Sequence, residues 1–226
     1  MTKAIVFDAS TLISFAMNGL LEEVKALKSV FKGNFIITNE VKYEVIDRPI
    51  KIKRFELEAL KVKSLLDAKI IELPSSIGIK DAEISKRAKE ILDIANKTFT
   101  GGGKGINLLH LGEASCLALS KILNEKKVEN AFAVDERTAR MLVEKPDNLK
   151  KLFEKKLHTR ITSDPKNYKF FEGIRIIRSA ELAYVAYKKG LVRLKDGIVL
   201  DALLYALKFK GCAISNEEIS EIKKLG

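Results

Sequence analysis

Two acidic residues follow short apolar runs of the chain, in positions where a carboxylate can do chemistry. Asp8 follows the run 4–7, and Asp135 follows the run 131–134. Runs rich in Ile, Val and Phe predict buried strands, and the carboxyl ends of parallel strands meet at one edge of a sheet. We therefore expect the two carboxylates to lie close together. The simpler alternative is that Asp8, Ser10 or Asp135 only caps the helix that follows.

Further acids lie in helical patterns. Glu113 falls in the first turn of a strongly apolar helix, so its carboxylate is expected to face a shared cleft, although the helix dipole alone also explains it. Glu40 and Glu44 lie one turn apart on another predicted helix. Either a positive group lies between them, or Glu40 interacts with the dipole at the start of the helix and Glu44 pairs with Arg48.

Carboxylates gathered in one cleft repel one another unless some take up protons or cations bind. Oxygen-only ligands select Mg²⁺ or Mn²⁺. Such an ion activates water for attack on a phosphodiester and stabilises the leaving oxygen. An acidic metal centre in a basic protein indicates a nuclease.

The composition favours a polyanionic partner. The 226 residues include 41 Lys and Arg against 30 Asp and Glu, a formal net charge of +11. Nucleic acid is the first expectation and an anionic membrane surface the second. No apolar stretch approaches the roughly 20 residues that span a bilayer, and no signal peptide precedes the first strand, so we expect a cytoplasmic protein without a membrane segment. Cys116 and Cys212 lack zinc-site spacing and are interpreted as buried thiols.

Strand and helix patterns alternate along the chain. Further strands are predicted at 34–38, 69–73 and 173–177, with helices between them. This alternation predicts an α/β fold with a parallel sheet covered by helices on both faces. We expect one domain, 1–226, with an elaborated helical region at about 49–107, which includes a basic helix at 51–68, and a basic insert at about 145–172, which includes one short helix.

The glycine-rich loop 100–105 lacks the Ser or Thr that must follow the Gly-Lys pair of a phosphate-binding P-loop. We interpret it as a flexible connector, with a mobile basic loop beside an active site as the alternative.

Several segments together resemble the PIN-domain family. They are residues 6–13, 37–45, 111–114, 134–140 and the turn 176–182, followed by the two-helix tail. The resemblance covers nearly the whole chain except the two elaborations. It implies a Rossmann-like sheet with strand order 3-2-1-4-5 and Mg²⁺- or Mn²⁺-dependent endonucleolytic cleavage of RNA.

The resemblance also implies roles for individual residues. The metal-binding and catalytic carboxylates would be Asp8, Glu44, Glu113 and Asp135, with Glu40 as the alternative to Glu44. Ser10 would orient Asp8, and Arg140 and Ser179 would approach the phosphate.

Two other functions are alternatives to the nuclease. A haloacid-dehalogenase-like phosphatase needs a second Asp two residues after the first, where this chain has Ser10. A catalytically silent nucleic-acid-binding or scaffold protein of the same fold is the main alternative. Among nucleases of this family, toxins paired with a small antitoxin protein and RNA-processing enzymes both fit the sequence, as does a homo-oligomer.

Overall fold

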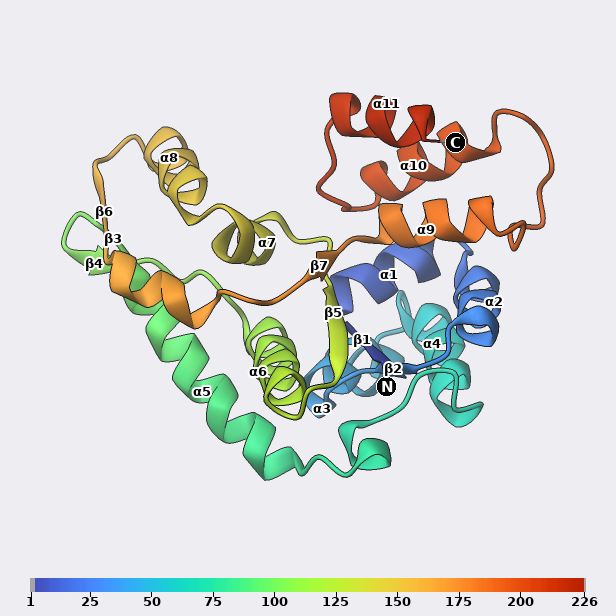
Figure 1. Ribbon diagram of the computed structural model, residues 1–226, viewed down its shortest axis with the longest axis horizontal. Coiled ribbons are helices and arrows are strands. Elements are labelled where there is room, and N and C mark those ends of the chain that lie inside the picture. The colour runs from blue at the N-terminus through green and yellow to red at the C-terminus, as the bar shows by residue number, and fades with distance from the viewer. Residues whose placement is uncertain (1–2, 226) are drawn as a thin grey trace.

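A parallel sheet lies at the centre of the computed structural model, which describes residues 3–225 (Figure 1). Within these residues the sheet has four strands in the order β2-β1-β5-β7. Their bounds are Asn34–Ile36, Lys3–Phe7, Glu129–Ala133 and Ile176–Ile177, in that order. All neighbours are parallel, and Phe7 pairs with Ala133. The α/β class and the adjacency of the two acid-tipped strands are confirmed.

The predicted third strand, 69–73, is wrong as an extended strand. It makes a single parallel bridge between Glu72 and Ile36, closed by hydrogen bonds from Ile37 N to Glu72 O and from Glu72 N to Phe35 O. Lys69 has a positive φ of 55°, and Pro74 starts a 3₁₀ turn, η3 (Pro74–Ile77). The segment between them is too short to form a ladder.

Helices lie on both sides of the sheet. Figure 1 shows α6 (Leu111–Glu125) on one side of the strands and α1 (Ala9–Met17) and α2 (Leu21–Val30) on the other. Ala114 and Ala118 of α6 are fully buried, and their small side chains let the helix pack closely on β1 and β5. The helix α3 (Asn39–Lys42) continues into a wider π-helical turn, η1 (Tyr43–Asp47), where a regular helix was expected.

The basic helix expected at 51–68 starts later. A 3₁₀ turn, η2 (Pro49–Lys51), comes first, and α4 covers Glu56–Asp67. Residues 52–55, between η2 and α4, therefore form an exposed turn.

The first elaboration from residue 81 onward and the second elaboration form one joint structure, which we call the arm. It contains α5 (Asp81–Thr98), β3 (Phe99–Gly101), β4 (Lys104–Gly105), α8 (Pro146–Leu157), β6 (Ile161–Ser163) and η4 (Pro165–Phe170). Its strands make an antiparallel sheet in the order β4-β3-β6 (Figure 1). The interpretation of loop 100–105 as a connector is wrong, because Gly102 and Gly103 adopt the positive φ values that close a hairpin.

Aromatic packing holds the arm together. Phe99 is fully buried, and its ring lies 6.0 Å from those of Phe153 and Tyr168. Phe99 comes from the first elaboration and its partners from the second. The prediction of one short helix in the basic insert therefore missed a strand and a 3₁₀ turn.

The C-terminal helices pack on α9 (Ser179–Lys188), away from the arm (Figure 1). They are α10 (Val199–Phe209) and α11 (Asn216–Lys224). Ser215 and Glu218 form the capping box that the sequence predicts at the start of α11. The remaining helix, α7 (Arg137–Glu144), follows β5. In the part of the chain that the structure describes, no helix combines the length and apolar character that crossing a bilayer requires.

Candidate carboxylate site

One serine joins the ends of the two central strands. Ser10 Oγ donates to Asp8 Oδ2 at 2.6 Å and accepts a hydrogen bond from Asp135 N at 3.0 Å. Ser10 N also donates to Asp8 Oδ2, so Asp8 caps α1 as well as ending β1. Asp8 and Asp135 are 3% and 1% exposed. The geometry thus fixes both carboxylates at one edge of the parallel sheet.

Asp135 is held from the opposite side by the start of α9. Ser179 N donates to Asp135 Oδ1 at 2.7 Å, and Ser179 Oγ donates to Asp135 Oδ2 at 2.6 Å. Ser179, expected near a phosphate, is fully buried and positions this carboxylate instead. The helix cap of α7 is provided by its neighbour Glu136, not by Asp135.

Glu113 approaches the same edge from α6. It is 5% exposed, and its Oε2 accepts a hydrogen bond from His110 N at 2.7 Å. This bond caps the helix, which was not predicted from the sequence, but it occupies only part of a buried carboxylate.

Glu44 reaches the site from the π-helical turn η1. Its carboxylate lies so close to Gly112 that a Cβ built there would be 2.7 Å from Oε2 and 2.8 Å from Oε1. A buried hydrogen bond of 2.6 Å between Thr38 Oγ1 and Ser115 Oγ holds α3 against α6. Gly112 therefore leaves the space that the Glu44 carboxylate fills.

Glu40, the alternative to Glu44, points elsewhere. Its Oε1 accepts a hydrogen bond from Ser85 Oγ of the arm helix α5. Burial raises the pKa of Asp81, and the charge of Glu40 adds a smaller rise. The structure thus brings Glu44, and not Glu40, to the edge where Asp8 ends β1.

Burial and mutual repulsion raise the pKa values of Asp8, Glu44 and Glu113. Burial raises the pKa of Asp8 despite the hydrogen bonds from Ser10, and the charge of Asp135 adds to the rise. Burial, followed by the charge of Asp8, raises the pKa of Glu44. Burial, with smaller contributions from Asp8, Glu136 and Glu44, raises the pKa of Glu113 from 4.5 to about 8. The cluster therefore favours a proton or a cation.

Glu136 is a functional candidate that sequence reasoning missed. Its spacing from Arg140 in the sequence suggests only an i, i+4 pair, but its Oε2 caps α7 through Ala139 N at 2.8 Å, and its charge acts on Glu113. The available signal was its position, directly after an acid at a strand end.

Arg140 does not join the carboxylates. Its Nε lies 3.9 Å from Glu144 Oε2, and its Nη1 lies 3.6 Å from Glu218 Oε1. With Arg137 and Lys208 it lines a pocket of about 310 Å³ beside the loop whose Ala213 N donates to Asp135 O.

The clustered carboxylates form no close ion pair with a cation of the described residues, although the charge of Arg48 acts on Glu44 from a greater distance. Across residues 3–225, none of Asp8, Glu44, Glu113 and Asp135 makes an ion pair with Lys or Arg within 4 Å. The same range contains no group of three or more His, Cys, Asp or Glu side chains placed to bind one metal ion. The donor chemistry fits Mg²⁺ or Mn²⁺, because Mg²⁺ commonly uses one or two carboxylates and completes its shell with water and phosphate oxygens.

Comparison of the chain with protein-family models, with curated proteins and with solved structures gives no match, so the site is described by its own residues and geometry.

Proposed function

We propose that the protein is a Mg²⁺- or Mn²⁺-dependent endoribonuclease of PIN-like fold. The segment at Glu72 beside β2, followed by β1, β5 and β7, supports the order 3-2-1-4-5 when the single bridge is counted as a strand position. The resemblance of the sequence to PIN domains supports the same assignment.

The carboxylate pair at the ends of β1 and β5 carries the proposal. Ser10 Oγ contacts both Asp8 Oδ2 and Asp135 N, so one hydroxyl sets the relative position of the two acids. Glu44 and Glu113 add further negative charge at this edge. A protein that buries unpaired acids and keeps their pKa values raised gains stability when a divalent cation replaces the protons.

One or two of the carboxylates of Asp8, Glu44 and Glu113 would hold the ion, and water and phosphate oxygens would complete its shell, with Asp135 supporting Asp8. When bound, the ion polarises the phosphodiester and lowers the pKa of a coordinated water. Ser10 and Ser179 keep Asp8 and Asp135 in place by hydrogen bonds from their hydroxyl and amide groups. The pocket lined by Arg137, Arg140 and Lys208 offers cations for a neighbouring phosphate.

RNA is the proposed substrate because of the charge of +11 and the resemblance. Several lysines of the arm lie on α8, where Lys151, Lys155 and Lys156 are exposed. Substrate binding and chemistry would thus use separate parts of the molecule with opposite charges.

One observation favours a second candidate, a catalytically silent nucleic-acid-binding protein. Asp135 has both oxygens bonded by Ser179, Glu113 is bonded by the His110 amide, and no three-ligand metal group exists within residues 3–225. A silent protein would bind RNA without cutting it.

Asp8→Asn separates the two candidates. A labelled single-stranded RNA is incubated with wild type or variant, with Mn²⁺ or with EDTA, and calorimetry measures Mn²⁺ binding in parallel. The endoribonuclease cuts RNA only with Mn²⁺, and the variant loses more than about a hundredfold in rate together with affinity for Mn²⁺. RNA binding without cleavage by the wild type would establish the silent protein.

A further inference from the structure

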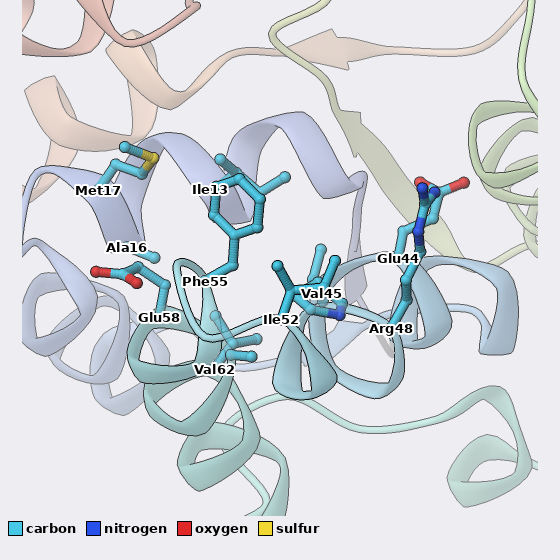
Figure 2. Close-up of a pocket in the computed structure, with 12 residues that line it drawn as sticks. Ile13, Ala16, Met17, Glu44, Val45, Arg48, Ile52, Phe55, Glu58 and Val62 are labelled. Carbon is cyan, nitrogen blue, oxygen red and sulfur yellow. The ribbon is translucent and has the colours of Figure 1, made fainter.

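An apolar pocket of about 270 Å³ lies beside the carboxylate site and shares Glu44 with it. Figure 2 shows Glu44 and Arg48 together at one end of this pocket and Met17 with Glu58 at the other. The positive charge of Arg48 acts on the Glu44 carboxylate. A ligand in the pocket therefore lies next to Glu44, which also belongs to the carboxylate site.

The pocket is lined by apolar side chains that stay accessible. Phe55, Ile13, Met17 and Ile52 are each 40–47% exposed, and Figure 2 shows the Phe55 ring beside Ile13. These residues come from α1 and from the turn before α4, so the pocket is built where the first elaboration meets the sheet region. Several large exposed side chains around one concavity mark a binding surface.

Cations are concentrated in the segment that leads to Phe55. The segment 48–54 contains Arg48, Lys51, Lys53 and Arg54 and no acid. The Arg54 guanidinium lies over the Phe55 ring, 5.4 Å from its centroid. Aromatic side chains next to Arg and Lys are the arrangement on which unpaired bases stack while their phosphates meet the cations.

We propose that this pocket holds one unpaired base of a single-stranded RNA, next to the phosphodiester that is cut at the carboxylate site. The inference rests on the proposed function and adds a binding site for one base at Phe55. The base stacks on Phe55, and Arg48 contacts the adjoining phosphate. The pocket lies at the lower limit of about 300 Å³ for small-molecule sites, which suits a single planar base better than a peptide helix.

Phe55→Ala tests the base contact. Anisotropy of a short fluorescein-labelled single-stranded RNA is measured in EDTA, so that binding is separated from cleavage. Stacking of one base predicts an affinity loss of about 5- to 150-fold. Leu57→Ala is the matched control, since Leu57 is 58% exposed on α4 and lies outside the pocket lining. It should bind as wild type does, and melting curves should show all variants folded.

An RNA series with one abasic position at a time identifies the base. When the abasic position lies next to the bond that is cut with Mn²⁺, the affinity of wild type for that RNA should fall. The loss should equal the loss that Phe55→Ala causes with intact RNA. The two changes together should cost little more than either alone, because both remove the same contact. Full additivity at every position would overturn the base pocket.

The outcomes distinguish this proposal from the function on which it rests. If wild type cuts RNA and Phe55→Ala binds RNA normally, the pocket assignment is wrong and the endoribonuclease stands. If wild type neither binds nor cuts RNA, both fail. If RNA affinity is insensitive to Phe55 while sedimentation shows self-association that Phe55→Ala removes, the pocket is a protein-binding face, and the proposal is overturned.

Discussion

The parallel sheet and the arm distribute charge in opposite ways. At the sheet edge, acids such as Asp8 and Glu113 are buried and lack a Lys or Arg partner among the described residues. On the arm, the lysines of α8 are mostly exposed. The buried acids at the sheet edge repel one another, and a bound cation relieves that repulsion. The exposed lysines of the arm attract phosphate groups over a distance. A nuclease needs both, in separate places.

The two regions also differ in how they are assembled. Asp8 and Asp135 reach their positions through two five-residue strands that lie side by side. The arm depends on β3 and β6, which are only three residues each and pair across 62 positions of the chain. The backbone of the site is therefore held by the ladder between β1 and β5, whereas the arm is held mainly by the packing of Phe99.

Glu113→Gln should produce the largest effect and tests whether the sheet edge is the reaction centre. The amide is a neutral, weaker ligand, so Mn²⁺-dependent RNA cleavage should fall by more than about a hundredfold. A gel assay of single-stranded RNA under single-turnover conditions measures the rate. The fold should persist, since Gln Oε1 is able to accept the His110 amide hydrogen bond that Glu113 accepts now.

Glu40→Gln is the matched control, because Glu40 bonds Ser85 and lies outside the cluster. It should keep wild-type cleavage. Equal losses in both variants would show that general charge, rather than the cluster at the sheet edge, governs the rate.

The stability of the metal-free protein should decrease as pH rises from about 5 to about 8. Burial raises the pKa of Glu113 from 4.5 to about 8, so across this window the folded chain binds more protons than the unfolded chain. The free energy of unfolding then falls by up to about 1.4 kcal/mol per pH unit for this group. Urea unfolding in EDTA measures the slope.

The same titration with Glu113→Gln isolates the contribution. The variant should show a shallower slope and exceed wild type in stability near pH 8, because it has no charge to bury. Mn²⁺ should restore the wild type at that pH by replacing the proton. Parallel slopes in wild type and variant would mean that Glu113 ionises normally.

The sequence predicted the strand ends because each is encoded locally, by an apolar run followed by an acid. Periodicity alone left Glu40 and Glu44 equivalent, since residues four apart share a face of an α-helix. The π-helical turn that begins at Tyr43, between them, changes that relation. The structure separates the two acids and brings Glu44, the one that the resemblance favours, to the sheet edge.

Contacts between distant segments had no local signal. Ser179 holds Asp135 across 44 positions, and nothing in the run of residues before β6 marks it as the partner of β3. The hairpin at Gly102 was misinterpreted because a glycine-rich loop and a tight turn have the same composition. The arm was therefore foreseen as two separate insertions.

Gly112→Ala sharpens the role of Glu44 without touching a carboxylate. The new methyl would lie within about 3 Å of the Glu44 carboxyl group, and that flexible end would move away from the site. Misplacement of about 1 Å predicts a cleavage loss of about ten- to a hundredfold. Stability should rise by up to about 1 kcal/mol, because Ala favours the helix.

Thermal melts and the cleavage assay together check this prediction. Gly197→Ala is the control, since a Cβ at Gly197 meets no atom within 4 Å. A Gly112→Ala protein that cuts RNA at the wild-type rate would remove Glu44 from the mechanism.

Replacing Lys150, Lys151, Lys155 and Lys156 with Ala should give the smallest effect, a severalfold loss of RNA affinity. These residues lie on α8, at a distance from the strand ends in Figure 1. Each lost phosphate contact lowers the slope of log affinity against log salt by about 0.7 for a single strand. Anisotropy titrations at several salt concentrations measure that slope, and the rate at saturating RNA should stay unchanged.

The control removes positive charge from the opposite end of the sheet. Lys32 and Lys126 precede β2 and β5, so they lie near the amino ends of parallel strands whose carboxyl ends form the site. Their replacement with Ala should leave the salt slope unchanged, because RNA engaged at the carboxyl edge does not reach them. If both sets of variants reduce the slope equally, RNA binds through net charge alone. If only the α8 set does so while the saturating rate is kept, the arm holds RNA and the sheet edge cuts it, which is the division of labour that their opposite charges imply.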